Sequence, residues 1–243
     1  MNIKRTLFIS DLHLDTSRPK VLLAFESFLQ EQQGHCEQLF ILGDLFEAWL
    51  GDDDRSDLST RVENALSSLA SSGCNIAIMH GNRDFLIGKE FCARCSAQLI
   101  EDPKVIDLYG RTVLLMHGDT LCTDDTEYLA FRAQIRQPAA QQGLLSKPLE
   151  ERRQIAAQMR ADSKDAMSNK AADIMDVTSA EVEAQMATHK VDLLIHGHTH
   201  RPNKHAHIIH AETRDRYVLG DWEDSLWYLE ATPDSTELVC RAI

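Results

Sequence analysis

The sequence predicts an α/β fold in which a mainly parallel sheet is covered by helices. Short apolar runs alternate with amphipathic segments along the first half of the chain, the pattern of strands joined by helical crossovers. Polar side chains follow the end of each predicted strand. The 243 residues are 43% hydrophobic and only 6% aromatic, which is enough for one large domain with a mostly aliphatic core.

Five buried strands are expected where short apolar runs end at turn residues. They lie at residues 6–10, 38–42, 75–79, 112–116 and 191–195. Helices are expected between them, at residues 19–34, 59–72 and 88–96. The first of these helices begins at Pro19 and ends near Gly34, which are favoured residue types at those two positions. The tail from 205 to 242 is expected to form short strands.

A helical insertion at about 124–189 is expected to interrupt this alternation. Its predicted helices cover residues 125–136, 149–160 and 179–189. Thr178 and Glu181 match a capping box for the last helix. No low-complexity linker separates the insertion from the rest, so residues 1–243 are expected to form a single domain.

Charge and composition exclude several classes of protein. A net charge of −13 argues against a general nucleic-acid binder. No segment approaches the roughly 20 apolar residues of a membrane span, and Asp11 and His13 interrupt the N-terminal apolar run, which is therefore a poor signal peptide. Both observations favour the cytoplasm, where the six scattered cysteines would be reduced. Cys92 and Cys95 are interpreted as two thiols on a helix, since no second pair completes a zinc site.

Acid, amide and imidazole groups follow the five predicted strands. Ligands bind beyond the carboxyl ends of strands in α/β sheets, so these groups are expected to meet at one edge. The set is Asp11, His13, Asp44, Asn82, His117, His198 and His200. Nitrogen and oxygen ligands without thiolates suit Mn²⁺, Mg²⁺, Fe or Zn²⁺. Seven ligands are too many for one tetrahedral ion, so we expect two ions that share a carboxylate, with neighbouring glycines allowing close approach of the backbone.

In order along the chain, these motifs resemble those of the calcineurin-like metallophosphoesterases. The matching motifs are Asp11-x-His13, Gly43-Asp44, Gly81-Asn82-Arg83-Asp84, His117-Gly118 and Gly197-His198-x-His200. The resemblance spans residues 7–200 and implies a two-sheet β-sandwich flanked by helices, with the insertion as a helical cap. It also implies two metal sites bridged by Asp44. The first would use Asp11, His13, Asp44 and His200, and the second Asp44, Asn82, His117 and His198.

Arg83 departs from the usual motif, because much of this family has His at that position. There the imidazole is thought to protonate the leaving group, which arginine cannot do at neutral pH. A guanidinium can instead hold a phosphate through two parallel hydrogen bonds. Arg83 therefore favours a substrate with a second phosphate, whose leaving group departs without a proton.

Longer stretches resemble one branch of the family, which hydrolyses UDP-2,3-diacylglucosamine in lipid A synthesis. They are ILGDLFEAWLGDDD at 41–54, HGNRDFL at 80–86, MHGDTLCTDD at 116–125, MRADSK at 159–164 and IMDV at 174–177. The resemblance implies release of UMP and 2,3-diacylglucosamine 1-phosphate with two Mn²⁺ ions, and catalytic roles for Asp44, Asn82, Arg83 and His117. It implies substrate contacts from Asn82, Arg83, Asp125, Ser163, Met167, Lys170 and His198, although Met167 stands where this branch usually has Asn.

The insertion also has the composition of a membrane-facing surface. Residues 129–164 contain seven basic and three acidic side chains, a local balance of +4 in an acidic chain. With apolar residues such as Leu144, Leu145, Ile155 and Met159, a cationic cap could lie on anionic lipid and shelter acyl chains. We therefore expect peripheral association with the cytoplasmic face of the inner membrane, although an ordinary amphipathic hairpin remains an alternative.

Two other functions stay open at this point. One is a metallophosphoesterase that acts on a soluble nucleotide, and the other is a non-catalytic scaffold of the same fold. Arg83 argues against a cyclic-nucleotide phosphodiesterase, and the full ligand set argues against the scaffold. No role is predicted for Asp221. Residues 52–54 are expected to form a solvated loop, and His205, His207 and His210 a surface cluster.

Overall fold

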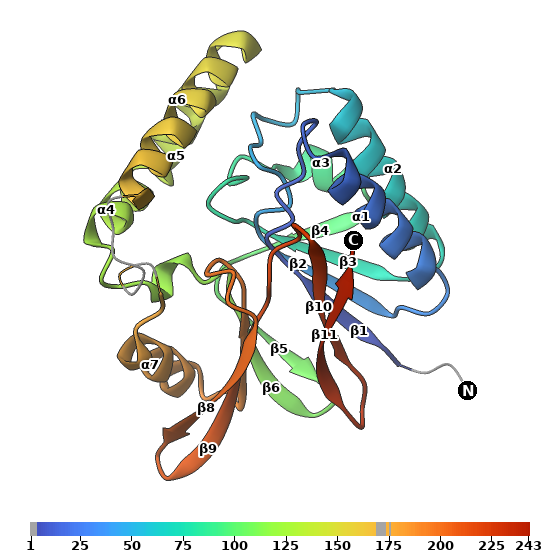
Figure 1. Ribbon diagram of the computed structural model, residues 1–243, viewed down its shortest axis with the longest axis vertical. Coiled ribbons are helices and arrows are strands. Elements are labelled where there is room, and N and C mark those ends of the chain that lie inside the picture. Colours follow the sequence, from blue (N-terminus) through green and yellow to red (C-terminus); the bar gives the residue numbers. More distant parts are fainter. Residues whose placement is uncertain (1–3, 169–173, 175) are drawn as a thin grey trace.

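The computed structural model describes residues 4–168, 174 and 176–243, and only the backbone of residues 164–168. Two mixed sheets stack face to face (Figure 1). The first has the order β11-β10-β1-β2-β3-β4, and the second β5-β6-β7-β9-β8. Strands of the first sheet are β1 (Thr6–Ile9), β2 (Gln38–Leu42), β3 (Asn75–Met79), β4 (Ala97–Ile100), β10 (Ser225–Ala231) and β11 (Thr236–Ala242). Those of the second are β5 (Lys104–Leu108), β6 (Arg111–Leu115), β7 (Leu193–His196), β8 (Asn203–Ile209) and β9 (Glu212–Val218).

Both sheets contain a parallel core with antiparallel strands beside it. In the first sheet, β1 to β4 are parallel, and β10 and β11 are antiparallel additions. In the second sheet, β6, β7 and β9 are parallel, and the edge strands β5 and β8 are antiparallel. The parallel strands therefore present their carboxyl ends at a common edge in each sheet.

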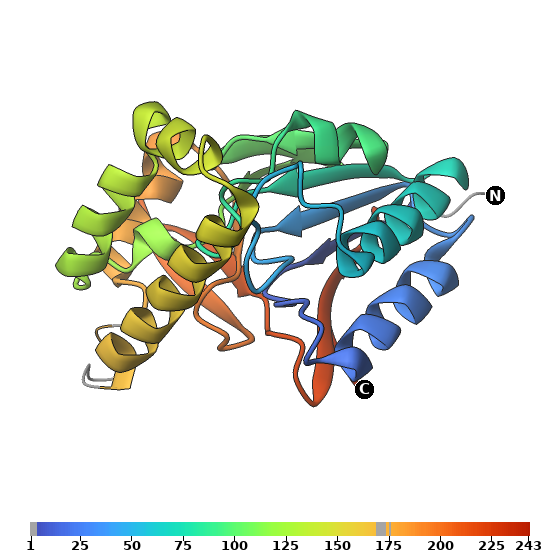
Figure 2. The ribbon, with the colours of Figure 1, turned by 90° about the horizontal axis from the view of Figure 1, so that it is seen from above.

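Helices cover the outer faces of the sandwich and also form a separate group beside it. Their bounds are α1 (Pro19–Gln32), α2 (Asp57–Ser71), α3 (Lys89–Arg94), the 3₁₀ helix η1 (Asp119–Leu121), α4 (Thr126–Ile135), α5 (Pro138–Leu145), α6 (Leu149–Ser168) and α7 (Ser179–His189). Figure 2 shows α1, α2 and α3 against the first sheet, and α4, α5 and α6 beside the sandwich.

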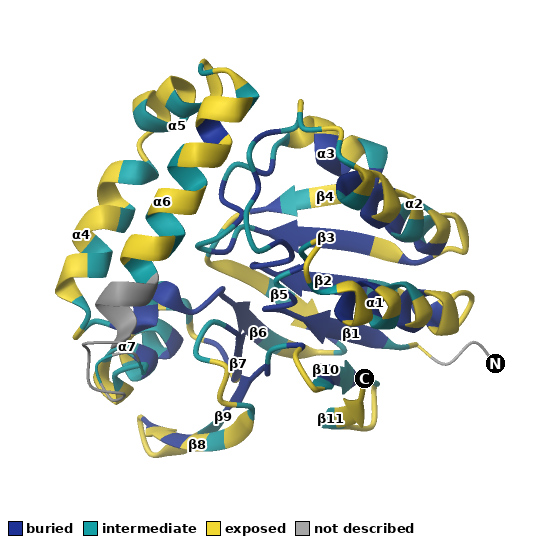
Figure 3. Ribbon diagram, turned by 45° about the horizontal axis from the view of Figure 1, so that its top comes forward, coloured by how far each residue is buried: buried dark blue, intermediate teal, exposed yellow. Residues whose placement is uncertain are grey.

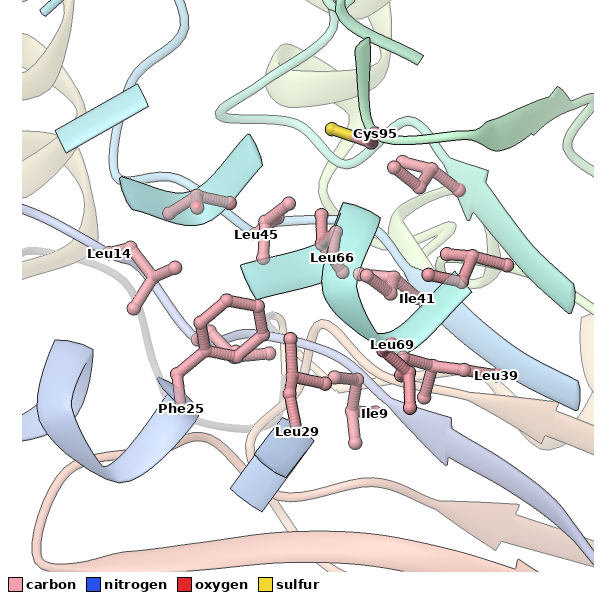
Figure 4. Packing of buried hydrophobic residues seen from close by; sticks show 14 of the residues in the cluster. Ile9, Leu14, Phe25, Leu29, Leu39, Ile41, Leu45, Leu66, Leu69 and Cys95 are labelled. Carbon is pink, nitrogen blue, oxygen red and sulfur yellow. The ribbon is translucent and has the colours of Figure 1, made fainter. Parts of the chain in front are cut away.

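Alternation of side chains along each strand builds the layers, since successive residues point to opposite faces. Leu7 and Ile9 of β1 pack under α1 and α2, and this apolar layer is drawn in Figure 4. Phe8 points the other way, into a second core shared with β6 and β7. A third cluster lies on the far face of the second sheet, where Val182 and Met186 of α7 pack. The order of layers is therefore helix, sheet, sheet, helix.

The cap helices α4, α5 and α6 lack this kind of core. The described residues of α4 and α5 include no buried side chain, and Figure 3 shows these helices as mostly exposed or intermediate. Charged contacts attach them to the sandwich. Arg152 of α6 pairs with Asp53 and donates to the carbonyl oxygen of Leu50, and Arg153 lies 3.5 Å from Asp54.

The expected strands and helices agree with the structure to within a few residues, but several details differ. The prediction missed α5, β4 and β5, and α6 continues to Ser168. The capping box is wrong: Thr178 precedes α7 without a side-chain cap, because its hydroxyl lies 2.7 Å from that of Thr123.

Two surface assignments need correction. The loop at residues 52–54 is solvated at Asp53, which is 61% exposed, but Asp52 accepts hydrogen bonds from the amides of Gly88 and Phe91, 2.9 and 3.0 Å away, at the start of α3. His207 does not belong to a surface cluster, because it is 8% exposed and accepts a hydrogen bond from Arg216. Of the two thiols expected on a helix, Cys92 lies on α3 and Cys95 caps its C-terminus, and both are buried.

Candidate metal centre

The carboxyl ends of the two parallel cores converge on the seven residues that the sequence analysis selected. Asp11 and His13 follow β1, and their amides donate to the carbonyl oxygens of Gly43 and Asp44, 3.1 and 3.0 Å away. In the second sheet, the Gly197 amide donates to the His117 carbonyl oxygen at 2.8 Å. The loops after the strands are thus tied to one another by main-chain hydrogen bonds.

Five of the seven residues have a left-handed backbone, which non-glycine residues adopt rarely and at an energetic cost. Their φ angles lie between 48° and 68°, for Asp11, His13, Asp44, His198 and His200. These five residues lie in three separate loops, after β1, β2 and β7. Strain concentrated in this way is characteristic of functional sites.

One group of side chains surrounds Asp11. Nε2 of His200 lies 3.4 Å from Asp11 Oδ1, and Nε2 of His13 lies 3.3 Å from Nε2 of His200. His13 Nε2 is also 3.8 Å from Asp44 Oδ2. The donor atoms of Asp11, His13 and His200 all lie within 4.8 Å of one another.

A second group surrounds Asn82. Its side-chain oxygen lies 3.0 Å from Nε2 of His117 and 3.0 Å from Nδ1 of His198. His117 Nε2 is 3.9 Å from Asp44 Oδ2, the same oxygen that faces His13. Asp44 therefore lies between the two groups, while its other oxygen accepts a hydrogen bond from the Arg83 amide at 2.8 Å.

Two glycines allow the loops to pack closely against the carboxylates of Asp44 and Asp11. A Cβ atom at Gly81 would lie 2.1 Å from Asp44 Oδ1, and one at Gly197 would lie 2.2 Å from Asp11 Oδ2. Real Cβ contacts are not this short, so any side chain here would displace the carboxylates. Glycine at these positions lets the backbone of one loop approach the carboxylate of another closely, whereas the expected close approach to a substrate stays a prediction.

The electrostatics of the site suit a positively charged occupant. Burial raises the pKa of Asp44, and the neighbouring charges of Asp84 and Asp11 raise it further. Burial lowers the pKa of His117, but the charges of Asp44, Asp119 and Asp11 outweigh it and raise that pKa to about 9. Burial and the neighbouring His117 lower the pKa of His198 to about 4. A divalent cation would compensate the crowded carboxylates and would bind the imidazoles in their neutral form.

The donor set fits divalent metal ions. Asp11 Oδ1 is buried and has no hydrogen-bond partner among the described residues, although it faces His200. A buried carboxylate oxygen without a donor is costly unless a cation meets it. Asp11, His13, Asp44 and His200 could hold one ion, and Asp44, Asn82, His117 and His198 another.

Oxygen atoms lie behind three of the imidazoles, a placement that the sequence did not reveal. The one behind His117 forms a hydrogen bond, and the carboxylates behind His13 and His200 make charge contacts. His117 Nδ1 lies 2.9 Å from the Leu42 carbonyl oxygen. His13 Nδ1 lies 3.1 Å from Glu47 Oε2, and His200 Nδ1 lies 3.6 Å from Asp221 Oδ2. In each case the opposite nitrogen, Nε2, faces the centre, the usual arrangement around metal-binding histidines. Neither acid carries a sequence signal, since each is recognised only by its neighbour in space.

The Asp84 carboxylate holds the loops of the metal centre in place through hydrogen bonds. It is fully buried, and its oxygens accept hydrogen bonds from the amides of Asp44, Leu45 and Gly81 at 3.3, 2.8 and 2.8 Å. One carboxylate thus fixes the loops after β2 and β3 relative to each other. Asp84 closes the Gly81-Asn82-Arg83-Asp84 motif, but the sequence alone indicates no role for it.

A cavity of about 650 Å³ adjoins the centre on the side of the cap. Its lining comes from the loops after β1, β2 and β3 and from α6, and comprises Asp15, Ser17, Arg18, Glu47, Arg83, Arg160 and Ala161. Arg83 therefore lies between the metal centre and a space that Arg160 also faces. Three arginines in one cavity suit a phosphorylated ligand.

The other residues expected to bind substrate lie on the cap. Asp125 caps α4, where its Oδ1 accepts a hydrogen bond from the Tyr128 amide at 3.1 Å. Ser163 is half-buried on α6. Lys170 and the side chain of Met167 lie outside the described residues. Arg136 donates to the Gly81 carbonyl oxygen at 2.7 Å, and so joins α4 to the loop of the metal centre.

Comparison with known proteins identifies the family of this chain and several close relatives. The calcineurin-like phosphoesterase family matches residues 4–202. UDP-2,3-diacylglucosamine hydrolase of Marinobacter nauticus is 52% identical over 93% of this chain and 93% of its own length. The proteins of that name from Cellvibrio japonicus and Salmonella typhi are 52% and 50% identical, covering 93% and 96% of this chain and 95% and 98% of their own.

Proposed function

The chain belongs to the calcineurin-like phosphoesterase family, and we propose that it hydrolyses UDP-2,3-diacylglucosamine to UMP and 2,3-diacylglucosamine 1-phosphate. The observation that supports this substrate most directly is the similarity to curated hydrolases of that name, which extends over nearly the whole of each chain. This similarity extends over the cap helices, which an enzyme for a small soluble nucleotide would not need. The reaction belongs to lipid A synthesis.

We assign the seven converging residues to two Mn²⁺ ions with Asp44 as the bridge. The oxygen and imidazole donors suit Mn²⁺, and the absence of thiolates from the set argues against a softer metal. When bound, two such ions would lower the pKa of a water molecule and offset charge on the phosphoryl oxygens. His117 and Asn82 would hold the second of the two ions together, since Nε2 of His117 and the Asn82 side-chain oxygen are 3.0 Å apart.

Arg83 determines which phosphoryl bond suits the site. Its guanidinium faces the cavity shared with Arg160 and Arg18, where it would hold the second phosphate of a pyrophosphate. The group released by cleavage is then itself a phosphate, which departs without protonation. The arginine therefore contributes charge and orientation, and the reaction requires no acid at this position.

We further propose that the enzyme acts at an anionic membrane surface on the cytoplasmic side of the inner membrane. Phe131 of α4 is 44% exposed and Leu145 of α5 is 43% exposed, and both belong to the basic insertion. No helix among the described residues is long and apolar enough to cross a bilayer. Apolar side chains among basic ones suit peripheral binding. Flotation with anionic and neutral vesicles tests this, and equal recovery with both would contradict it.

The deciding experiment measures Mn²⁺-dependent release of UMP from UDP-2,3-diacylglucosamine in detergent. The wild type is expected to be active and Asp44→Ala to be inactive. Asp234→Ala, a substitution at an exposed surface residue, is the control and is expected to be as active as the wild type. Hydrolysis of simple phosphodiesters without release of UMP would preserve the metal site and overturn the substrate. Full activity in Asp44→Ala would overturn the site itself.

A further inference from the structure

A second cavity lies behind the segment that connects His198 to His200, and no part of the proposed reaction uses it. It has a volume of about 310 Å³ and opens at the start of β8 and the end of β9. The lining residues are Asp176, Thr199, Arg201, Pro202, Asn203, His205, Arg216 and Val218. None of the seven candidate metal ligands belongs to this lining.

Arg216 is a buried cation that forms no ion pair with a described residue, although the charge of Asp176, which lines the same cavity, acts on it. Its side chain is 6% exposed. Nε donates a hydrogen bond to His207 Nε2 at 3.2 Å, and Nη1 lies 3.0 Å from His196 Nε2. No described carboxylate lies within 4.0 Å of the guanidinium, and no described residue accepts a hydrogen bond from Nη2. Imidazoles bring no negative charge, and Asp176, which already pairs with Arg201, compensates this buried arginine only from beyond ion-pair distance, so the burial is costly.

The rim of the cavity supplies groups that bind oxyanions. Arg201, which is 46% exposed, forms an ion pair with Asp176 at the rim. The Thr199 hydroxyl is buried and has no hydrogen-bond partner among the described residues. His205 lies opposite Arg216 in the pairing of β8 with β9. Among the described lining residues, two guanidinium groups and one carboxylate give a positive balance, whereas the chain as a whole carries −13.

We propose that this cavity binds a phosphate group, either inorganic phosphate or the end of a phosphomonoester, between Arg216 and Arg201. Arginine is suited to this role because its planar guanidinium matches the geometry of phosphate oxygens. Thr199 is placed to donate its hydroxyl to the same ligand. An anion here would give Arg216 a counter-charge at hydrogen-bond distance, which Asp176 does not provide. This site is separate from the metal centre and does not depend on the substrate proposed above.

The test is a calorimetric titration of metal-free protein, which removes phosphate binding by metal ions. Inorganic phosphate is expected to bind the wild type, and Arg201→Gln to weaken binding about tenfold, the effect of losing one charge-assisted hydrogen bond. Lys204→Gln is the matched control, because it removes the same charge from the neighbouring strand but does not line the cavity. It is expected to stay within about twofold of the wild type, since an exposed charge contributes little.

Two further arms complete the experiment. Because Arg216 is buried, Arg216→Gln can lower the stability of the protein as well as its affinity for phosphate. Asn203→Asp provides a second variant at the exposed rim, where the added carboxylate should weaken phosphate binding by repulsion. Parallel titrations with UMP distinguish a phosphomonoester from free phosphate as the ligand. Absence of phosphate binding, or equal weakening in Lys204→Gln and Arg201→Gln, would overturn the proposal.

Discussion

The Glu47 carboxylate lies 3.1 Å from Nδ1 of His13, on the ring edge opposite the nitrogen that faces Asp44. Asp221 stands in the corresponding position behind His200, 3.6 Å from its Nδ1. Both imidazoles belong to the group around Asp11, whereas His117 of the other group is oriented by a main-chain carbonyl oxygen. Acidic support is thus specific to the first of the two candidate metal positions.

Neutralising these acids should weaken the first metal position and spare the second. Glu47→Gln and Asp221→Asn are each expected to lower the affinity for Mn²⁺ about tenfold or more, the usual effect of losing a group that orients a ligand. Equilibrium dialysis at limiting Mn²⁺, followed by elemental analysis, should show occupancy falling toward one ion per chain. Glu223→Gln, at an exposed position near Asp221, is the control. Unchanged metal content in both variants would contradict the prediction.

The strands and the seven converging residues could be predicted because local signals specify them. The division into two mixed sheets was implied only by the resemblance to the family, since the apolar runs alone predicted one mainly parallel sheet. Apolar runs mark β1, β2, β3, β6 and β7, and the polar motifs follow directly after those strands. Contacts between distant segments gave no such signal. The ion pair of Asp53 could not be predicted because its partner, Arg152, lies on a helix 99 residues further along the chain. The burial of His207 depends on the register of β8 with β9, which places Arg216 beside it.

Substitutions at Arg83 should distinguish the contribution of its positive charge from that of its paired hydrogen bonds to phosphate. Arg83→Ala is expected to reduce kcat/KM about 10²–10³-fold, comparable to the loss of one preorganised donor at a phosphoryl or oxyanion site. Arg83→Lys retains the charge but loses the paired hydrogen bonds, so it should recover only part of that loss. Steady-state UMP release measures both. Equal activity of the lysine variant and the wild type would exclude a bidentate role for the guanidinium.

Removal of Asp84 should destabilise the whole protein as well as the site. Asp84→Ala leaves the amides of Asp44, Leu45 and Gly81 without their acceptor in a buried environment. We expect the free energy of unfolding to fall by about 3 kcal/mol or more, since each unsatisfied buried donor costs about 1–3 kcal/mol. Urea unfolding of metal-free protein provides the measurement, with exposed Asp234→Ala as the control. A loss below 1 kcal/mol would show that water replaces the carboxylate.

Arg152 should control how firmly α6 is attached beside the catalytic cavity. Its side chain is 5% exposed, pairs with Asp53 and donates to the Leu50 carbonyl oxygen, while α6 also positions Arg160 at the cavity. Arg152→Ala is therefore expected to raise KM about tenfold while kcat changes less than about twofold, because binding is lost equally in the ground and transition states.

Hydrogen exchange separates this attachment from a general loss of stability. Amides of α6 should exchange faster in Arg152→Ala than in the wild type, whereas those of β1, β2 and β3 should keep their protection, because the cap lacks a core of its own. Lys147→Ala is the matched control, since Lys147 forms only an exposed pair with Glu151 through its side chain. An equal fall in kcat, or faster exchange throughout the sandwich, would show that Arg152 supports the fold rather than the position of α6.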